Sequence, residues 1–328
     1  MSKSLGNGED PMDVIEKYGA DSLRFFLTTN SAPGMDLRYD EEKVASTWNF
    51  INKLWNASRF VLMNLEDFKE EDIATNYSIS EEWILTKMQN TILEVRKNMD
   101  KYEFHNVGNT LYNFIWEDFC DNYIEVSKAN MNNTTKTVLL EVLTAILKML
   151  HPFMPYVTEE IYSSLPIKEA KSIMISKYPE YEASKIFTKS ASTFEKILED
   201  IQNIRNLKAV NKITKDAYVS VEVDKKYQNI YFSELKIKEE QFGEYPELET
   251  RNYQSKYINI TYYFEGEKED LEKIREDIKN LEASILRREK LLSNENYVNK
   301  APANIVELDR QKLKEEKEKL EALKTSLN

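Results

Sequence analysis

The chain has 328 residues with few glycines and prolines (7 and 8) and 31% charged residues, which favours helices and excludes an all-β fold. A single cysteine, Cys120, excludes a disulfide framework and a cysteine-built zinc site and is typical of a reducing cytoplasm. No apolar run reaches membrane-spanning length, no signal segment opens the chain, and the net charge of −12 leaves only local basic patches for nucleic acid.

The amino-terminal part, residues 1–42, reads as a loop followed by short helices. Residues 1–9 are small and polar, and Asp10 followed by Pro11 predicts a capped helix start. Gly19 is expected to end that helix. A second short helix is predicted over 21–29, with Leu23, Phe26 and Leu27 facing inward.

A long helix is predicted over residues 41–65, and it has two distinct faces. Apolar steps of three and four residues predict a buried face of Val44, Ile51, Trp55, Ser58, Leu62 and Leu65, flanked by Leu54 and Val61. The opposite stripe comprises Asn49, Asn52, Lys53, Asn56 and Phe60, with Arg59 at its margin. Amides, cations and an aromatic ring suit the base edges, phosphates and base faces of a nucleic acid. The same amides can equally bond to a neighbouring helix, so the pattern leaves both interpretations open.

Further amphipathic helices complete an antiparallel bundle over residues 43–166. They are predicted over 80–101, 105–131, 134–149 and, shorter, 157–165. The first of them is expected to bury Trp83, Ile84, Met88, Ile92, Val95 and Met99. The predicted fold is therefore mainly α.

Residues 167–265 differ in sequence pattern from the bundle and predict a small α/β module. We expect a short extended piece over 173–178, a helix over 192–209, and alternating strands over 217–223 and 257–264. The segments between these strands are not assigned. A packing or spacer role is the expectation for this module.

The last part, residues 266–328, carries two runs with Leu and Ile at three- and four-residue steps. Arg288 interrupts the first run and Glu316 the second, and Pro302 prevents one continuous helix. We predict an antiparallel coiled-coil hairpin about 35–40 Å long in a monomeric protein. A dimerising coiled coil is the alternative, and the midway break with matching arms favours the hairpin.

Complete catalytic constellations are absent: the sequence has no Gly-rich phosphate motif, no Ser/His/Asp set and no metal-ligand spacing. One candidate remains in the first loop. Lys3, flanked by Ser2 and Ser4, suits an ammonium that reaches triphosphate oxygens, and a disordered terminus is the alternative.

Several ordered segments resemble one enzyme family. Residues 1–7 with 10–24 resemble the KMSKS signature region of class I aminoacyl-tRNA synthetases. The remaining segments resemble the anticodon-binding bundle and carboxy-terminal arm of the valine enzymes: 34–38, 49–60, 116–125, 151–160 and 292–302. The resemblance covers essentially the whole chain and is weakest over 166–255.

This resemblance implies an enzyme that joins valine to valine tRNA, with ATP and Mg²⁺, through an aminoacyl-adenylate. It implies that Lys3 stabilises the ATP phosphates and that Ser2 and Ser4 shape the loop. It assigns the anticodon side of the tRNA to Lys53, Arg59, Phe60, Ile124 and Glu125. It assigns the outer corner of the tRNA to basic residues of the arm: Arg287, Arg288, Lys290 and Lys300.

The sequence also departs from the family pattern. The first lysine of the signature, the nucleotide-binding fold and the editing domain are not in it, so we expect an inactive carboxy-terminal piece that does not hold ATP alone. An isoleucine enzyme is one alternative, although its zinc module needs several cysteines. A free-standing helical RNA-binding or scaffold protein is the other.

Overall fold

The structure is a computed structural model that describes residues 9–31, 34–265, 271–293, 297 and 303–326. The chain forms two compact units. The first comprises Met1–Ile213, Ser220–Phe242 and Asn252–Thr261, and the second comprises Thr214–Val219, Gly243–Arg251 and Tyr262–Asn328. None of the helices in these described ranges is both long and apolar enough to cross a membrane.

The first two helices, α1 (Pro11–Tyr18) and α2 (Ala20–Thr29), meet at Gly19. The Asp10 side chain accepts a hydrogen bond from the Met12 amide at 2.9 Å, and Gly19 ends α1 with a φ of +82°, as predicted. Phe26 is fully buried, but the expectation for Leu27 was wrong, because this side chain is 48% exposed. The face of α2 that packs on α3 and α5 instead carries Ser22, Phe25, Phe26 and Thr29.

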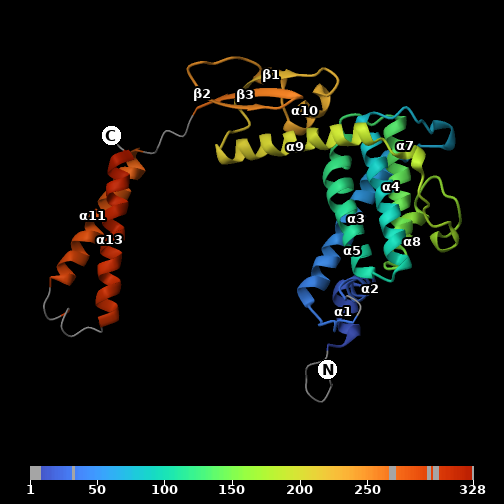
Figure 1. Ribbon diagram of the computed structural model, residues 1–328, viewed down its shortest axis with the longest axis horizontal. Helices are drawn as coiled ribbons and strands as arrows, with labels where there is room; N and C mark the ends of the chain where they lie inside the picture. The colour runs from blue at the N-terminus through green and yellow to red at the C-terminus, as the bar shows by residue number, and fades with distance from the viewer. Residues whose placement is uncertain (1–8, 32–33, 266–270, 294–296, 298–302, 327–328) are drawn as a thin grey trace. The chain divides into compact units, whose positions relative to one another are not determined.

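The predicted bundle is confirmed, and Figure 1 shows its long helices side by side. Its elements are α3 (Glu41–Asn64), α4 (Ile79–Asp100), α5 (Phe104–Asn113), a π-helical segment (Phe114–Tyr123), α6 (Ile124–Ser127), α7 (Asn133–Leu150) and α8 (Pro155–Ser163). The α4 side chains predicted to face inward are buried, apart from Met99, which is partly buried against the same core. In the π-helical segment, the Asn122 side chain donates from Nδ2 to the Glu117 backbone carbonyl at 2.8 Å, across the wider turn.

The buried face of α3 differs from the prediction at its centre. Trp55, expected inside, is 46% exposed, whereas Leu54 and Val61, expected at the flank, are fully buried. The core of the bundle is centred on Phe50, Leu54, Ala57 and Val61. One residue on a helix is a rotation of about 100°, so a small error in the centre of the stripe moves Trp55 from core to solvent.

The small α/β module follows in α9 (Thr188–Val210), β1 (Tyr218–Val223), α10 (Gln228–Leu235), β2 (Glu249–Gln254) and β3 (Ile258–Phe264). The strands form one antiparallel sheet in the order β1-β3-β2. Both predicted strands are confirmed, but β2 was missed because its polar residues are mostly exposed at a sheet edge. A 3₁₀ turn at Ile173–Ile175 stands where an extended piece was expected.

A buried carboxylate ties the helices of this module to its strands. Asp200 of α9 accepts hydrogen bonds from three hydroxyls: Tyr231 at 2.6 Å, Tyr253 at 2.9 Å and Ser255 at 2.7 Å. Three donors satisfy a buried carboxylate that would otherwise be costly to desolvate. The sequence did not indicate this network.

The carboxy-terminal arm is a helical hairpin, as predicted, in which α11 (Leu271–Leu292) packs along α13 (Ala303–Ser326). Ile285 and Val306 are buried between the two helices. The two polar interruptions of the apolar pattern meet each other, because the Arg288 guanidinium lies 3.0 Å from the Glu316 carboxylate. The pairing aligns one helix against the other.

Candidate nucleic-acid interface

Lys53, a predicted RNA contact on α3, already has partners within the chain. Its Nζ lies 2.6 Å from Asp121 Oδ1 and 3.7 Å from the centroid of the Trp116 ring. Trp116 in turn stacks on Tyr112 at 5.4 Å. A carboxylate and a ring face therefore already hold this ammonium, and a phosphate would have to compete with Asp121.

Phe60 lies half-buried near the carboxy-terminal end of α3 and packs against the bundle core. Lys128 Nζ stands 5.7 Å from its ring centroid and 2.6 Å from Glu125 Oε1. The structure therefore brings Phe60 and Glu125 together around Lys128, which sequence reasoning missed. Ile124 does not join them at the surface, since it is only 5% exposed and belongs to the core.

Three of the remaining polar residues of the predicted stripe are exposed, and the fourth, Asn52, is partly buried. Arg59 is exposed and has no ion-pair partner among the residues that the structure describes. The Asn56 amide donates to the Asn52 carbonyl of its own helix at 2.9 Å and does not reach a neighbouring helix. Asn49 is exposed. The interpretation that these amides bridge helices inside the bundle is therefore wrong for Asn56.

Two exposed aromatic side chains were missed on the same helix. Trp48 is 44% exposed and Trp55 is 46% exposed. Together with Asn52 and Arg59 they follow steps of four, three and four residues, which places them on one face. That spacing was readable in the sequence, but the assignment of Trp55 to the core concealed it.

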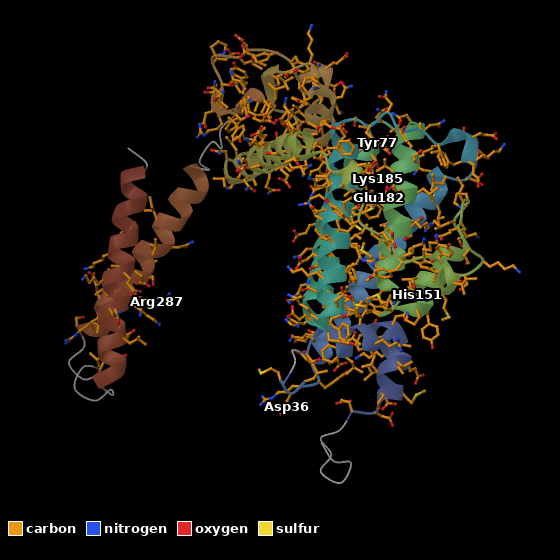
Figure 2. All side chains as sticks on the ribbon, turned by 45° about the vertical axis from the view of Figure 1, so that its right-hand side comes forward. Asp36, Tyr77, His151, Glu182, Lys185 and Arg287 are labelled. Carbon is orange, nitrogen blue, oxygen red and sulfur yellow. The ribbon has the colours of Figure 1, made fainter. Side chains whose placement is uncertain are left out.

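The predicted basic residues of the arm differ in exposure and in pairing. Arg287 and Lys290 are exposed, and Figure 2 labels Arg287 on α11. Arg288 instead lies between two carboxylates of α13, 2.7 Å from Asp309 and 3.0 Å from Glu316. Hydrogen bonds from Tyr297 and then Arg288 hold the pKa of Asp309 below its usual range, and the hydrogen bond from Arg288 does the same for the pKa of Glu316. Lys300 lies outside the described residues, as do Ser2, Lys3 and Ser4.

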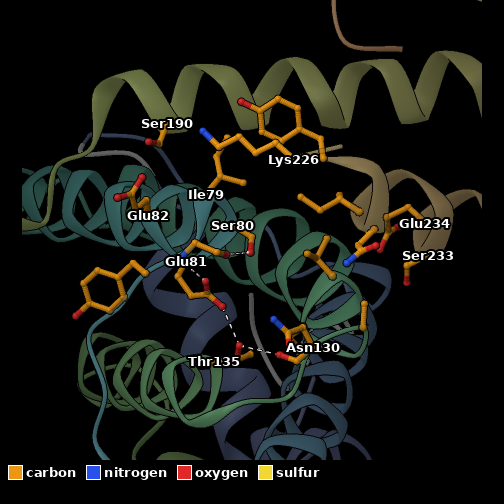
Figure 3. A pocket seen from close by; sticks show the side chains of 18 of the residues that line it. Ile79, Ser80, Glu81, Glu82, Asn130, Thr135, Ser190, Lys226, Ser233 and Glu234 are labelled. Atoms are coloured by element: carbon orange, nitrogen blue, oxygen red, sulfur yellow. Dashed lines mark hydrogen bonds between the residues drawn. The ribbon is translucent and has the colours of Figure 1, made fainter. Parts of the chain in front are cut away.

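A cavity of about 960 Å³ opens between the amino-terminal end of α4, the end of α6, α9 and α10 (Figure 3). Its buried acid, Glu81, accepts hydrogen bonds from the Ser78 amide and the Thr135 hydroxyl, both at 2.8 Å. Glu81 thus caps α4.

Within the described part of the chain, no group of three His, Cys, Asp or Glu side chains could hold a metal ion.

Titratable groups of the bundle have structural partners. Burial raises the pKa of Asp118 to about 6, against the opposing effect of Lys87 at 3.4 Å. Near the other end, the Asp21 carboxylate accepts from the amides of Tyr156 and Val157 and thereby caps α8. Burial lowers the pKa of His151, whose Nδ1 lies 2.8 Å from Thr158 Oγ1 (Figure 2).

A surface ion-pair network links α7 to the segment before α9. Lys185 Nζ lies 2.7 Å from Glu141 Oε1 and 3.2 Å from a Glu182 carboxylate oxygen, and Figure 2 shows Lys185 and Glu182 near Tyr77. The arrangement joins elements and contains no nucleophile beside a base.

Comparison with known proteins matches three successive parts of the chain. Residues 1–40 match the family described as tRNA synthetases class I (I, L, M and V), residues 81–223 the anticodon-binding domain of tRNA ligase, and residues 264–328 the valyl tRNA synthetase tRNA binding arm. The valine–tRNA ligase of Bacillus cereus is 42% identical over 351 aligned residues, covering 100% of this chain and 40% of that protein. This chain belongs to the valine–tRNA ligase family.

The valine–tRNA ligase of Staphylococcus epidermidis is also 42% identical, over 365 aligned residues, with 100% of this chain and 40% of that protein covered. The chain thus spans about two fifths of the length of these relatives and corresponds to their carboxy-terminal portion. Among solved structures, a leucyl enzyme of Agrobacterium radiobacter K84 aligns over 57% of this chain and 23% of its own, at 18% identity and a TM-score of 0.47, which adds nothing to the assignment.

Valine–tRNA ligases therefore account for the chain better than either alternative, an isoleucine enzyme or a free-standing scaffold. The arm residues Arg287, Arg288 and Lys290 lie within the match to the tRNA binding arm. Helix α3 lies between the regions that match the class I synthetase family and the anticodon-binding domain, and the alignment with the Bacillus cereus ligase covers it. An RNA-binding role for the stripe on α3 is therefore inferred from its own side chains and not from a match to a family model.

Proposed function

We propose that this chain supplies the tRNA-binding part of a valine–tRNA ligase. The bundle would take the anticodon side of valine tRNA through Lys53, Arg59, Phe60 and Glu125, and the arm would take the outer corner through Arg287, Lys290 and Lys300. The observation that carries the proposal is the similarity to valine–tRNA ligases over the entire chain, with a carboxy-terminal segment similar to their tRNA binding arm. A cytoplasmic location belongs to the same proposal.

The activity of the whole ligase, ATP-dependent joining of valine to its tRNA, is part of this proposal. Lys3 would contribute one cation to the ATP phosphates, and Ser2 and Ser4 would shape its loop. Mg²⁺ would arrive with ATP. Ile124, the first residue of α6, is buried in the bundle core, so its contribution would be to pack α6 and not to touch RNA.

A first experiment tests whether the chain alone activates valine. One solvated lysine interacts with a phosphate charge by about 1 kcal/mol, which is far too little to assemble an adenylation site. Valine-dependent exchange of pyrophosphate into ATP by the purified chain should therefore equal the background. Exchange well above background would contradict the proposed division of labour.

A second experiment tests the tRNA partner. Binding of the purified chain is measured with transcripts of valine tRNA and isoleucine tRNA at the same salt concentration. We expect tighter binding of valine tRNA, because the bundle is proposed to contact the anticodon side, where the two tRNAs differ. Equal affinity for both transcripts would indicate nonspecific charge attraction and would contradict a valine-specific role.

A further inference from the structure

Helix α3 has an unusual charge distribution for this protein. The chain carries 57 acidic residues and a net charge of −12. Yet residues 43–65 contain no Asp or Glu, and they do contain Lys43, Lys53 and Arg59. An ordinary solvated helix face mixes both signs of charge. A stretch of this length with cations alone is complementary to a polyanion.

The exposed face of this helix also presents large rings. Trp48 and Trp55 are seven residues apart, are each nearly half exposed, and share a face with Arg59. The other two tryptophans differ, since Trp83 is 1% exposed and Trp116 is covered by Lys53 and Tyr112. Tryptophan left at a surface beside a guanidinium and asparagine amides matches the chemistry by which proteins bind unpaired bases.

We propose that Trp48 and Trp55, with Arg59, form a stacking surface for unpaired bases of RNA. The inference rests on the proposed function and deepens it, because it names the side chains on which the bases of the tRNA lie. Phe60 is less suited to that role, since one ring face meets Lys128 and part of the ring packs against the core.

The spacing of the two rings sets how a strand can follow them. Seven residues of helix advance about 10 Å at 1.5 Å per residue. Stacked nucleotides advance about 3.4 Å each along a strand. The two rings therefore meet bases about three nucleotides apart and act as separate contacts. Their substitutions should weaken binding independently, so that the double variant shows the product of the two single losses.

The test measures binding of the anticodon stem-loop of valine tRNA by Trp48→Ala, Trp55→Ala and the double variant. Each single variant should bind about ten-fold more weakly. The melting temperature should fall only slightly, because nearly half of each side chain is exposed. Tyr156→Ala is the matched control, since Tyr156 is an aromatic residue 68% exposed on α8. It should bind like the unmodified chain.

Two substitutions separate stacking from simple apolar bulk. Trp55→Phe keeps a ring and should retain most of the affinity, whereas Trp55→Leu keeps an apolar side chain and should lose it. Fluorescence gives an independent measurement, because acrylamide reaches exposed tryptophans and bound RNA should shield them. The Trp48→Phe/Trp55→Phe double variant should lose most of that RNA-dependent protection.

The outcomes distinguish this inference from the proposed function. If the unmodified chain binds the stem-loop and the tryptophan variants bind it equally well, the stacking surface is refuted and the proposed function stands. Equal loss in Trp55→Phe and Trp55→Leu would also refute stacking, because it would show that an aromatic ring at this position does not preserve RNA binding. If the unmodified chain binds no RNA, the proposed function fails, and the inference fails with it.

Discussion

Phe60 illustrates how one side chain can serve two purposes at the residue scale. It is half-buried against the bundle core, and Lys128 lies over one ring face at 5.7 Å. Its removal is therefore expected to affect stability as well as any contact with RNA. The two cations of α3 differ in the same way in their availability for RNA. Arg59 is exposed and unpaired among the described residues, whereas Asp121 already holds Lys53 at 2.6 Å.

Two substitutions of Phe60 separate these effects. Phe60→Ala should lower the free energy of unfolding by about 1–2 kcal/mol, less than for a fully buried ring, because only part of the side chain is packed. Phe60→Leu should keep most of the packing and stay within about 1 kcal/mol of the unmodified chain. Urea unfolding of both variants tests this expectation. Equal stability of Phe60→Ala and the unmodified chain would show that the ring does not support the core.

Asp118 provides a prediction about pH. Burial raises its pKa from 3.8 to about 6 in the folded chain. Between those values the folded state holds a proton that the unfolded state has released, so this group makes stability fall as pH rises from about 4 to 6. Asp118→Asn removes this effect. The difference between the melting temperature of Asp118→Asn and that of the unmodified chain is the quantity to measure. This difference should be more positive at pH 7 than at pH 4.5. A difference that is the same at both pH values would contradict the raised pKa.

At the scale of the element, the arm depends on a polar contact inside an apolar pattern. Arg288 lies 2.7 Å from Asp309 and 3.0 Å from Glu316, and Tyr297 donates to Asp309 at 2.7 Å. A guanidinium shared by two carboxylates specifies how α11 and α13 align, while an apolar seam alone tolerates slippage. The residue beside it, Arg287, is exposed. Neighbouring arginines of one helix thus have different roles.

Matched substitutions of the two arginines test this division. Arg288→Met leaves two partly buried carboxylates without their cation, so amide hydrogen exchange in α11 and α13 should accelerate. Arg287→Met should leave exchange unchanged and should weaken binding of full-length valine tRNA, with a smaller salt dependence. Faster exchange in Arg287→Met, or tRNA binding that is weakened only in Arg288→Met, would reverse the assignment.

At the scale of the whole molecule, the described bundle and the arm are expected to bind different parts of one tRNA. The bundle has its own continuous core, which includes residues from Phe25 to Phe194. The arm, in contrast, buries Ile285 and Val306 between its own two helices. Removing the arm should therefore leave the bundle folded, since no residue of that core lies in it.

Deletion of residues 266–328 should weaken binding of full-length valine tRNA and flatten its salt dependence. Binding of the isolated anticodon stem-loop should stay the same, because the stem-loop does not reach the outer corner. Sedimentation of the intact chain should show a monomer at micromolar concentration, since α11 already pairs with α13. A dimer that dissociates on deletion of the arm, with tRNA affinity unchanged, would restore the dimerising coiled coil.

The sequence by itself determined the elements with strong periodic patterns and clear end signals. The bundle helices, the cap at Asp10, the strand at 258–264 and the two arms of the hairpin all depend on local spacing and on backbone preferences that adjacent residues express. The segments resembling valine enzymes also lay in the sequence. These features were predictable because each is encoded within a few turns of chain.

Only the tertiary structure decided which side of each helix is buried and which charges are already paired. Leu54 and Trp55 are adjacent on α3, and the surrounding helices bury the first and leave the second in solvent. Likewise, Arg288 meets Glu316 through a contact between residues 28 positions apart. Apolar periodicity sets the width of a helix stripe, whereas its centre depends on neighbours distant in sequence. The candidate RNA surface therefore required the packed bundle to be seen.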